Sequence, residues 1–549
     1  MQLSPSAHVD TFCRDNLPSP SQRPDLLFTL PGLAYPDRLN CAEALLDKTI
    51  ERHGAGRPCL LSDGDTWSYG DLRRHADQVA RVLTEDFGVV PGNRVLLRGP
   101  NTPWLAACWL GAVKSGAVVV TTMALLRSAE LTAICEIAQV RLALCDSRLT
   151  GELAAAGVPG IQLVGYGGDG PDDLVQRAAA KPAGFTAVAT AADDVAMIAF
   201  TSGTTGRPKA AMHFHREVLA IADTFSARVL RPTPDDIFTG TPPFAFTFGL
   251  GGLLIFPLHA GAATLLLERA APAELADHIA ARGVTVCFTA PTAYRAMLAA
   301  GKAGQLRGLR RPVSAGEHLS AATWQAFYDA TGVRIIDGIG STELLHIFIS
   351  AADQAIKPGS TGVPVPGYQA AIVDDEGKPV PDGEPGRLAV KGPTGCKYLA
   401  DARQRNYVQD GWNLTGDTYI RDSDGYFWYQ ARSDDIIVSS GYNIAGAEIE
   451  EALLSHPDVA ECGVVGVPDE ARGQLVKAYV VLRDGAPADA AKVGELQEFV
   501  KQKITPYKYP RAIEFLAALP RTSTGKLQRY RLRELSGSSV HYRQAAPQS

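Results

Sequence analysis

The sequence lacks the cysteine patterns of a disulfide framework or a zinc site. Its nine cysteines are scattered, none is spaced as C-x-x-C, and their number is odd. Disulfide scaffolds and structural zinc sites need paired, closely spaced cysteines, so both are excluded. The N-terminus also lacks a basic stretch followed by an apolar run, so we expect no secretory signal peptide. We therefore expect reduced thiols and a cytoplasmic location.

Charge of one sign does not dominate the chain either. There are 53 Lys and Arg against 59 Asp and Glu, which gives a net charge of −6. A general nucleic-acid binder carries a basic excess. Nucleic acid is therefore not an expected partner.

One uncharged stretch resembles a membrane span. The 31 residues 237–267 contain no charged side chain, but Pro242, Pro243, Pro257 and five glycines divide them. No piece reaches the roughly 20 apolar residues that a spanning helix needs. We expect no membrane partner, and a buried strand, loop and helix of a large core.

The chain is too long for one hydrophobic core. It has 549 residues, of which 46% are hydrophobic and 20% charged, as is typical of a globular protein. Single cores stop growing near roughly 250 to 300 residues, so at least two domains are expected. In the first four hundred residues, strand patterns such as residues 117–122 alternate with helical patterns such as residues 104–114. This alternation predicts an α/β fold of parallel sheets covered by helices.

Two changes of pattern divide the remaining chain. At residues 368–392 short strands surround the turns DDEGKP and DGEPG, which predicts a small antiparallel β subdomain at about residues 366–433. From about Asp434 the helices and strands predict a compact α+β unit. We expect an N-terminal domain of residues 1–433, a C-terminal domain of residues 434–535 and a disordered tail of residues 536–549.

The strongest chemical signal is the nonapeptide TSGTTGRPK at residues 201–209, which follows an apolar strand pattern. Small and hydroxylated residues let a backbone approach a polyphosphate, and Lys209 adds a positive charge. In the common NTPase loop Gly and Lys are adjacent, whereas Gly206 and Lys209 are separated in this sequence. A polar turn between a strand and a helix is the alternative interpretation.

This nonapeptide resembles the phosphate loop of the adenylate-forming superfamily, which contains acyl-CoA ligases, carrier-protein adenylation domains and luciferases. Similar motifs follow in the superfamily's order: GIGSTE at 338–343, TGD at 415–417, RSDD at 432–435 and RTSTGK at 521–526. A lone T-G-D or G-K would mean little. Jointly and in this order, the motifs identify the chain as a member of the superfamily.

The resemblance implies a set of nucleotide-binding and catalytic residues. Thr342 would contact the α-phosphate and Glu343 would bind Mg²⁺. Asp417 would accept hydrogen bonds from the ribose, and Lys526 would bridge the carboxylate and phosphate oxygens. The residues expected to bind ATP are Thr201, Ser202, Gly203, Thr204, Thr205, Gly206, Lys209, Gly316, Glu317, Asp337, Gly338, Ile339, Gly340, Ser341, Asp417 and Arg432.

Three of these residues have simpler explanations when taken singly. Lys526 is typical of a solvated lysine, Asp417 of a turn carboxylate and Glu343 of a carboxylate in the first turn of a helix. The chemistry favours a functional role, because a carboxylate must displace pyrophosphate from ATP before a thiol can attack it. That displacement accumulates negative charge, which positioned cations stabilise.

The two steps of this reaction need two arrangements of one site. Enzymes of the superfamily rotate the C-terminal domain about a hinge, which by resemblance is Asp434. Gly441 and Tyr442 resemble the loop that lines the pantetheine tunnel for CoA, although Gly441 also fits a simple turn. Residues 501–533 contain nine Lys or Arg and one acidic residue. They either meet the phosphates of CoA or form a solvated charged face.

The acid pocket is less clearly encoded. His346 resembles the histidine that borders the aryl ring in benzoate-CoA and 2-aminobenzoate-CoA ligases, and Ile339 stands where many relatives have an aromatic residue against adenine. Phe244, Phe246 and Phe248 alternate as on one face of a strand, so packing in the core is their other interpretation. A histidine beside an apolar run is also often a core residue. The slot is expected to be lined by Phe246, Phe248, Ala315 and His346.

The resemblance and the motifs predict an ATP-dependent aryl-CoA ligase that uses Mg²⁺ and CoA. Its expected substrate is 2-aminobenzoate or benzoate, and its expected state is a monomer or homodimer. Two other functions fit parts of the sequence: a stand-alone enzyme that adenylates an aryl acid and loads a carrier protein, and a nucleotide-binding paralogue without catalysis. The joint presence of Lys209, Glu343, Asp417 and Lys526 weighs against the paralogue.

Overall fold

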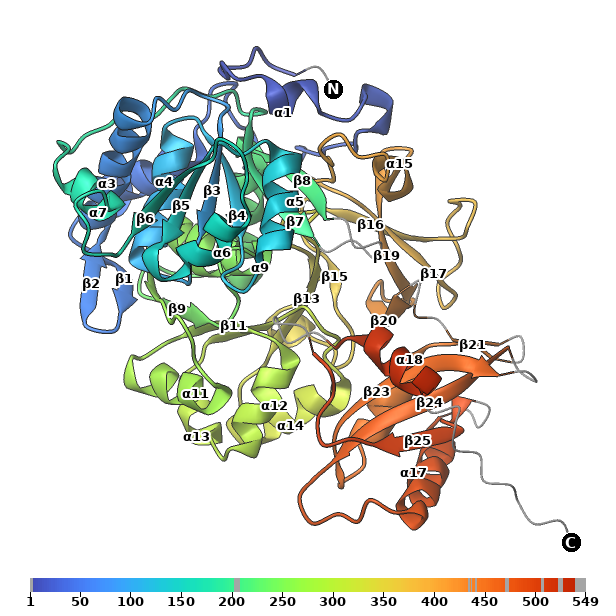
Figure 1. Ribbon diagram of the computed structural model, residues 1–549. Helices are drawn as coiled ribbons and strands as arrows, with labels where there is room; N and C mark the ends of the chain where they lie inside the picture. The colour runs from blue at the N-terminus through green and yellow to red at the C-terminus, as the bar shows by residue number, and fades with distance from the viewer. Residues whose placement is uncertain are drawn as a thin grey trace, which may run out of the picture.

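The computed structural model describes residues 3–201, 208–432, 435, 437–439, 442–469, 473–504, 508–521 and 527–538. These residues form four β-sheets, two large and covered by helices, one small and antiparallel, and one in the C-terminal domain (Figure 1). The α/β fold with a large N-terminal and a small C-terminal domain is therefore confirmed. The nine cysteines are all buried and free, in agreement with reduced thiols.

The first large sheet carries the two ends of the predicted phosphate loop. Its first five strands are parallel, and β8 joins the edge antiparallel to β7. The central strands are fully buried and apolar, as parallel strands covered on both faces require. In spatial order the strands are β6 (Gln162–Tyr166), β5 (Leu142–Asp146), β3 (Arg94–Arg98), β4 (Val118–Thr122), β7 (Val195–Thr201) and β8 (Lys209–Phe214).

The second large sheet contains the ends of the uncharged stretch. Residues 237–267 form β9, buried helices and β10, as predicted. Among the residues that the structure describes, no helix is long and apolar enough to cross a membrane. In spatial order the strands are β15 (Val363–Pro364), β14 (Ile347–Ser350), β13 (Ile336–Gly340), β12 (Arg311–Ser314), β11 (Val286–Thr289), β9 (Ile237–Gly240), β10 (Ala263–Leu265), β1 (Pro58–Ser62) and β2 (Asp65–Ser68).

Helices cover these sheets, and their first residues show why they begin where they do. Ser68 and Asp71 form a capping box at α3, and the Thr102 hydroxyl accepts the Leu105 N–H at α4. A π-helical segment, Ala222–Leu230, continues α8. The helices are α1 (Phe12–Asp15), α2 (Lys48–His53), α3 (Tyr69–Arg81), α4 (Pro103–Lys114), α5 (Ser128–Ala138), α6 (Thr150–Ala155), α7 (Leu174–Ala179), α8 (His215–Ile221), α9 (Thr247–Leu250), α10 (Phe256–Ala260), α11 (Pro272–Ala281), α12 (Pro291–Ala299), α13 (Ala303–Leu306), α14 (Ala321–Thr331) and α15 (Gln404–Tyr407).

The β subdomain is an antiparallel sheet, as the turn sequences predict. Turns rich in Gly, Pro and Asp connect its strands. It lies between the large sheets and the C-terminal domain in Figure 1. Its strands are β16 (Gln369–Val373), β17 (Pro385–Lys391), β18 (Val408–Gln409), β19 (Trp412–Arg421) and β20 (Phe427–Arg432).

The C-terminal domain is an α+β unit that contacts α14, where the Ala321 N–H donates to a Glu451 carboxylate oxygen at 3.1 Å. The expected start of a disordered tail at Ser536 is wrong, because α18 continues to Ser538 and the Ser536 hydroxyl donates to the Leu532 carbonyl oxygen at 3.2 Å. The elements are β21 (Ile437–Ser439), β22 (Tyr442–Ile444), α16 (Gly446–Leu454), β23 (Val459–Asp469), β24 (Gly473–Leu482), α17 (Ala490–Lys503), β25 (Ala512–Phe515) and α18 (Arg529–Ser538).

Candidate active site

The predicted phosphate loop connects two antiparallel strands at the edge of the first sheet. β7 ends at Thr201, β8 begins at Lys209, and these two residues are paired in the register. The loop residues Ser202, Gly203, Thr204, Thr205 and Gly206 lie outside the described residues. The alternative of a turn between a strand and a helix is wrong, because β8 follows the loop directly.

A tight turn carries the residues predicted to bind AMP and Mg²⁺. β13 and β14 pair with an irregularity between Ile339 and Gly340, and Leu345 adopts a φ of 68° in the turn that joins them. A left-handed backbone is uncommon for leucine and needs support from its surroundings. The turn buries Glu343 and leaves Thr342 partly exposed.

Three side chains from other segments contact this turn. Each of them contacts a different polar residue of the turn, Ser341, Thr342 or Glu343. Burial lowers the pKa of His213 to about 3, so its ring is neutral. A carbonyl oxygen only accepts, so the ring carries its proton on the nitrogen that faces the turn. The contacts are Tyr407 Oη to Ser341 Oγ at 3.2 Å, His213 Nε2 to the Thr342 carbonyl oxygen at 2.8 Å, and Tyr398 Oη to Glu343 Oε1 at 2.5 Å.

Lys209 meets Glu343 beside the phenol of Tyr398. The Lys209 ammonium lies 2.8 Å from Tyr398 Oη and 3.3 Å from Glu343 Oε1. The fold thus brings together the cation of the phosphate loop and the carboxylate predicted to bind the metal. Among the described residues Glu343 Oε2 has no hydrogen bond, so this oxygen is available to a hard cation. The residues therefore fit a Mg²⁺ ion.

β13 approaches its neighbours so closely that glycine is required at two predicted nucleotide-binding positions. A Cβ at Gly338 would lie 2.7 Å from the Ile347 side chain, and one at Gly340 would lie 2.7 Å from the His346 carbonyl oxygen. Asp337 precedes them. Burial raises the pKa of Asp337 to about 8, and its Oδ1 has no well-formed hydrogen bond among the described residues. A ligand can satisfy such a group.

The predicted ribose site lies on two adjacent strands of the β subdomain. Asp417 on β19 and Arg432 on β20 are direct cross-strand partners. Asp417 is buried, and its backbone N–H donates to Thr415 Oγ1 at 3.3 Å. Gly316, in the loop after β12, has a φ of 90°, which glycine adopts without strain.

The base of the predicted catalytic-lysine loop lies against the predicted AMP-binding loop. Lys526 and the predicted hinge residue Asp434 lie outside the described residues. Arg521 and Leu527, which flank the lysine loop, pair as an isolated bridge. Arg521 Nη1 lies 2.7 Å from a Glu317 carboxylate oxygen. This ion pair joins the C-terminal domain to the loop that follows β12.

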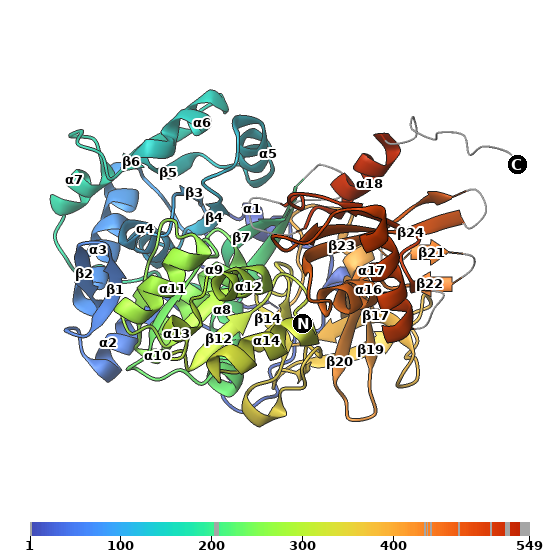
Figure 2. The same cartoon turned by 90° about the horizontal axis from the view of Figure 1, so that it is seen from below.

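The segment predicted to line the pantetheine tunnel lies elsewhere. Gly441 is outside the described residues, and Tyr442 begins β22, which pairs with β21. Figures 1 and 2 both show these strands on the side of the C-terminal domain away from the two large sheets. The described base of the lysine loop and the strands β21 and β22 therefore do not face the site together.

Ion pairs neutralise much of the basic stretch at residues 501–533. Its local positive charge is lower than the sequence alone suggests. A role at the phosphates of CoA stays a prediction. The pairs are Lys501 with Glu498, Lys508 with Glu448, Arg521 with Glu317 and Glu461, Arg529 with Glu450, and Arg533 with Asp435.

The three phenylalanines near the predicted acid slot do not form a strand. Phe244 lies in a loop, Phe246 immediately precedes α9, and Phe248 lies within that helix. The strand interpretation is wrong, because the two prolines before them have no N–H to donate to a sheet. Phe248 contacts His346, with ring centroids 5.7 Å apart. Phe246 is half-buried at the start of the helix.

Aromatic rings and a glycine enclose His346. Burial lowers the pKa of His346 to about 3, and neither ring nitrogen has a hydrogen bond of good geometry among the described residues. A Cβ at Gly251 would lie 2.3 Å from His346 Cδ2. Ala315 and Ile339 belong to the edge of the same core. The surrounding rings are Phe225, Phe248, Phe256 and Phe288, with centroids 5.6, 5.7, 4.6 and 6.3 Å from the imidazole.

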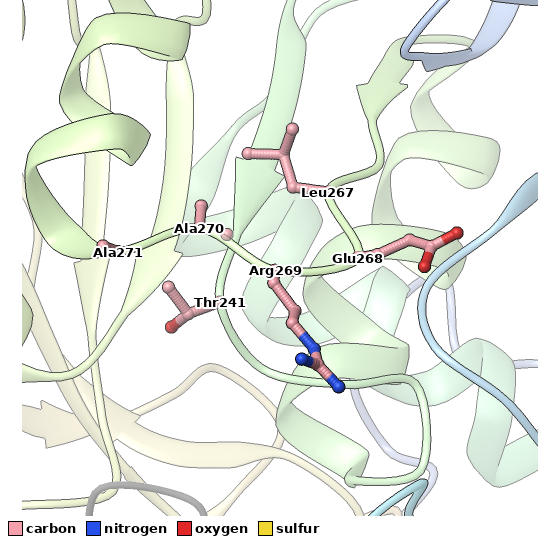
Figure 3. Close-up of a pocket in the computed structure, with 7 residues that line it drawn as sticks. Thr241, Leu267, Glu268, Arg269, Ala270 and Ala271 are labelled. Atoms are coloured by element: carbon pink, nitrogen blue, oxygen red, sulfur yellow. The ribbon is translucent and has the colours of Figure 1, made fainter. Parts of the chain in front are cut away.

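A hollow of about 330 Å³ lies at the end of β9. Gly240, Thr241 and the loop between β10 and α11 line it (Figure 3). Within that loop Glu268 is paired with Arg148 at 2.9 Å, and Arg269 is exposed. The hollow contains none of the residues predicted for the acid slot, and its charged walls do not suit an aryl ring.

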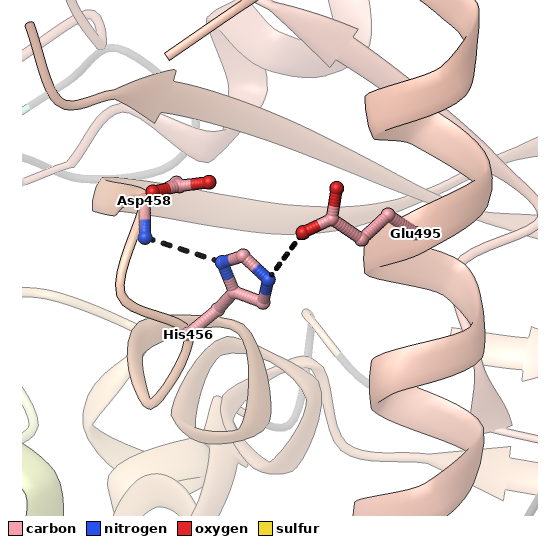
Figure 4. Close-up of side chains that lie close together, drawn as sticks. All are labelled: His456, Asp458 and Glu495. Carbon is pink, nitrogen blue, oxygen red and sulfur yellow. Dashed lines mark hydrogen bonds and ion pairs between the residues drawn. The ribbon is translucent and has the colours of Figure 1, made fainter. Parts of the chain in front are cut away.

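A cluster in the C-terminal domain has the composition of a metal site, but its groups satisfy one another. The Asp458 N–H donates to His456 Nδ1 at 3.2 Å, so the ring proton is on Nε2, which lies 3.0 Å from Glu495 (Figure 4). Lys492 pairs with Asp458 at 2.6 Å and with Glu495 at 2.7 Å. The imidazole has no spare lone pair and a cation is already present, so the cluster does not suit a metal.

The comparisons with known proteins agree with this geometry. Residues 46–398 match the AMP-binding enzyme family, and residues 448–526 match the AMP-binding enzyme C-terminal domain. The chain belongs to the AMP-binding enzyme family. The predicted membership of the adenylate-forming superfamily is thereby confirmed.

Similar proteins cover almost the whole chain. A benzoate–CoA ligase of Thauera aromatica is 34% identical over 92% of this chain and 98% of its own length. A 4-hydroxybenzoate–CoA/benzoate–CoA ligase of Rhodopseudomonas palustris is also 34% identical, over 92% of this chain and 96% of its own length.

Two solved structures are similar in fold and sequence. The anthranilate CoA ligase AuaEII in complex with anthranoyl-AMP has a TM-score of 0.87 and 34% identity and covers 92% of this chain and 99% of its own. A benzoate CoA ligase of Burkholderia xenovorans has a TM-score of 0.84 and 32% identity, and it covers 90% of this chain and 100% of its own.

Proposed function

We propose that this AMP-binding enzyme is an ATP-dependent aryl-CoA ligase that makes an aryl-adenylate and then its CoA thioester. The contact between Lys209 and Glu343 is the main support for the proposal, because it places a cation suited to phosphate beside a carboxylate suited to a metal. The ion pair between Arg521 and Glu317 supports it, since it holds the base of the Lys526 loop at the same site. The ligases named among the similar proteins act on benzoate, 4-hydroxybenzoate and anthranilate, which supports an aromatic acid as the substrate.

In the first step a carboxylate oxygen of the aryl acid attacks the α-phosphorus of ATP, and the bond to pyrophosphate breaks. Lys526 bridges the attacking carboxylate and the α-phosphate, while Lys209 binds the departing phosphates. Asp417 orients the ribose. Glu343 would hold a Mg²⁺ ion, which when bound would supply further neutralisation of the pyrophosphate charge. Removing one such preorganised group typically costs a factor of about 10² to 10³ in rate.

In the second step the thiol of CoA loses its proton, its sulfur attacks the acyl carbonyl carbon, and AMP leaves. The domain boundary near Asp434 acts as the hinge for this step. Rotation withdraws Lys526 and brings Gly441 and Tyr442 to the site. The ion pair between Arg521 and Glu317 belongs to the arrangement of the first step.

The acid slot suits a short, flat substrate. Phe248 and His346 form one side, with Ala315 near the edge of the same core. The imidazole is neutral, and its nitrogens have no hydrogen bond of good geometry within the described part of the chain, so its unprotonated nitrogen can accept a hydrogen bond from an ortho-amino group. An apolar slot separates ring substituents by only about 1 to 3 kcal/mol per methylene-sized group, whereas a hydrogen bond discriminates more strongly. These properties support 2-aminobenzoate or benzoate as the acid.

The test is a comparison of kcat/KM for benzoate, 2-aminobenzoate, 4-hydroxybenzoate and a linear fatty acid, with AMP and the CoA thioester both measured. We expect thioester formation with one or both of the first two acids. No CoA-dependent AMP release with any aromatic acid would contradict the proposal. Adenylate formation without transfer to free CoA would instead support an enzyme that loads a carrier protein.

A further inference from the structure

We propose that Tyr398 is a positioning residue that holds Glu343 in place for Mg²⁺ and keeps Lys209 beside it until a nucleotide binds. The inference rests on the proposed function, because it assigns Lys209 and Glu343 to ATP and its metal. It adds a third group to that pair, one that belongs to none of the motifs described above.

Tyr398 is firmly fixed in the structure. Its side chain is 1% exposed. Its segment runs along β8, where the Leu399 N–H donates to the Ala210 carbonyl oxygen at 2.9 Å. The Tyr398 N–H donates to Gln404 Oε1 at 2.8 Å, and the ring packs edge-on against Tyr407 with centroids 5.9 Å apart. Backbone hydrogen bonding therefore holds the segment that carries the phenol against β8, the strand that begins at Lys209.

The direction of each hydrogen bond at Tyr398 follows from the charges. A phenol carries one proton at neutral pH, because a tyrosine side chain ionises only at about pH 10. The phenol O–H donates a hydrogen bond to Glu343 Oε1, which can only accept, and the phenol oxygen accepts a hydrogen bond from the Lys209 ammonium. Tyr398 thus bridges an anion and a cation that lie 3.3 Å apart.

A Mg²⁺–ATP complex would exchange the partners of this trio. Lys209 would leave Glu343 for the phosphates, and the metal would take its place at the carboxylate. Tyr398 alone would keep its hydrogen bond through the exchange, so Glu343 would not have to be repositioned. Without the phenol, Lys209 is the one described side chain that contacts the Glu343 carboxylate, and no described donor stays on the carboxylate once Lys209 leaves for the phosphates.

The first experiment compares Tyr398→Phe with a matched control, Tyr69→Phe. Tyr69, the first residue of α3, is also buried, and its hydroxyl donates to the backbone carbonyl oxygens of Pro257 and Ala262. None of these three residues belongs to the trio. Calorimetric titration with ATP over a series of Mg²⁺ concentrations measures binding without turnover, because no acid is present. We expect the Mg²⁺ concentration at half-maximal ATP binding to rise about tenfold in Tyr398→Phe, as for loss of one hydrogen bond to a charged group. Tyr69→Phe should leave it unchanged.

The second experiment uses Glu343→Gln and ATP with EDTA in place of Mg²⁺. The neutral amide releases Lys209, so metal-free ATP should bind several-fold more tightly than to the wild type, and added Mg²⁺ should have little further effect. A purely structural role for this cluster predicts weaker binding in both conditions.

The outcomes separate this inference from the proposed function. If the wild type forms aryl-adenylate but Tyr398→Phe keeps the wild-type dependence on Mg²⁺, the positioning role is wrong and the proposed function stands. If Glu343→Gln binds metal-free ATP no better than the wild type, Lys209 is not held by Glu343. A wild type that binds no ATP at all contradicts the proposed function itself.

Discussion

Gly251 restricts the position of the His346 ring, whose nitrogens have no hydrogen bond of good geometry among the described residues. A Cβ at this position would lie 2.3 Å from His346 Cδ2, closer than any allowed contact. We therefore expect Gly251→Ala to displace the ring and raise KM for the aromatic acid about tenfold or more, while KM for ATP stays within about twofold. Steady-state kinetics with each substrate varied in turn check this. The control is Gly304→Ala, where a Cβ meets nothing within 4 Å. An unchanged KM for the acid in Gly251→Ala would show that His346 is not at the acid slot.

Asp337 is the second residue with an unusual environment, and its effect on stability depends on pH. Burial raises the pKa of Asp337 to about 8, so between pH 4 and 8 the native state holds a proton that the unfolded chain releases. Its contribution to stability is therefore present at low pH and is lost as pH rises toward 8. We expect Asp337→Asn to become progressively more stable than the wild type over this range, by about 1 kcal/mol or more at pH 8, and by a constant amount above it.

The measurement for Asp337 is the thermal unfolding midpoint of both proteins without nucleotide at several values of pH. The two curves should diverge from pH 5 to 8. Parallel curves would mean that the carboxyl is ionised in the native protein. If ATP donates a hydrogen bond to Asp337, the difference between the unfolding midpoints of the wild type and Asp337→Asn should disappear when ATP is present.

At the residue scale the sequence predicted the members of the motifs but not the side chains that support them. Lys209 and Glu343 could be selected because their motifs have a recognisable spacing. Tyr398, Tyr407 and His213 could not, since each contacts the turn at 341–343 from a distant part of the chain. A single buried tyrosine has no sequence signal that separates a support from an ordinary core residue.

At the scale of elements, the contact between the lysine loop and the loop after β12 is the clearest functional feature. Arg521 joins them through Glu317, and its side chain is 24% exposed. We expect Arg521→Gln to slow adenylate formation by about threefold to tenfold, the size expected for a partly exposed ion pair. The rate of thioester formation from supplied aryl-adenylate should change less, because this step uses the other arrangement.

A control for Arg521 comes from the same basic stretch. Lys501 is paired with Glu498 within α17, and both side chains are substantially exposed. Lys501→Gln should leave adenylate formation unchanged, because this half-reaction does not use CoA. Rapid-quench measurement of the two half-reactions checks the prediction. Equal slowing of both half-reactions by Arg521→Gln would contradict a role specific to the first arrangement.

Elements were easier to predict than their local shapes. The helices and strands from α3 to β12 follow from apolar periodicity and capping residues, which are local signals. The alternate phenylalanines at 244–248 fit one face of a strand as well as an acid slot. The two prolines before them prevent sheet pairing, and the chain turns into α9 instead. The acid slot was therefore only partly predictable, because its walls come from helices, a hairpin and a π-helical segment.

At the scale of the whole molecule, the proposed function assigns the acid and nucleotide sites to the large domain and predicts that the small domain contributes one face at a time. The strands β21 and β22 lie away from the large sheets while the base of the Lys526 loop contacts them. Length and composition required two domains. The order in which their faces are used follows only from the proposed function.

This division of labour predicts opposite effects for two substitutions in the small domain. Lys526→Ala should lower adenylate formation by a factor of about 10² to 10³ and spare thioester formation from supplied aryl-adenylate. Gly441→Ile, which fills the tunnel, should spare adenylate formation and block the thioester. Assays of each half-reaction test this. If both variants lose both half-reactions equally, the small domain does not present alternate faces.

The central claim is that the protein activates an aromatic acid as an adenylate before CoA reacts. The most direct measurement mixes the enzyme in molar excess with ATP, Mg²⁺ and 2-aminobenzoate or benzoate, first without CoA, and quantifies the products by mass spectrometry. We predict that aryl-AMP accumulates to near the amount of acid supplied and is converted to the aryl-CoA thioester and AMP when CoA is added. Formation of ADP and phosphate, or of no aryl-AMP with either acid, would contradict the account.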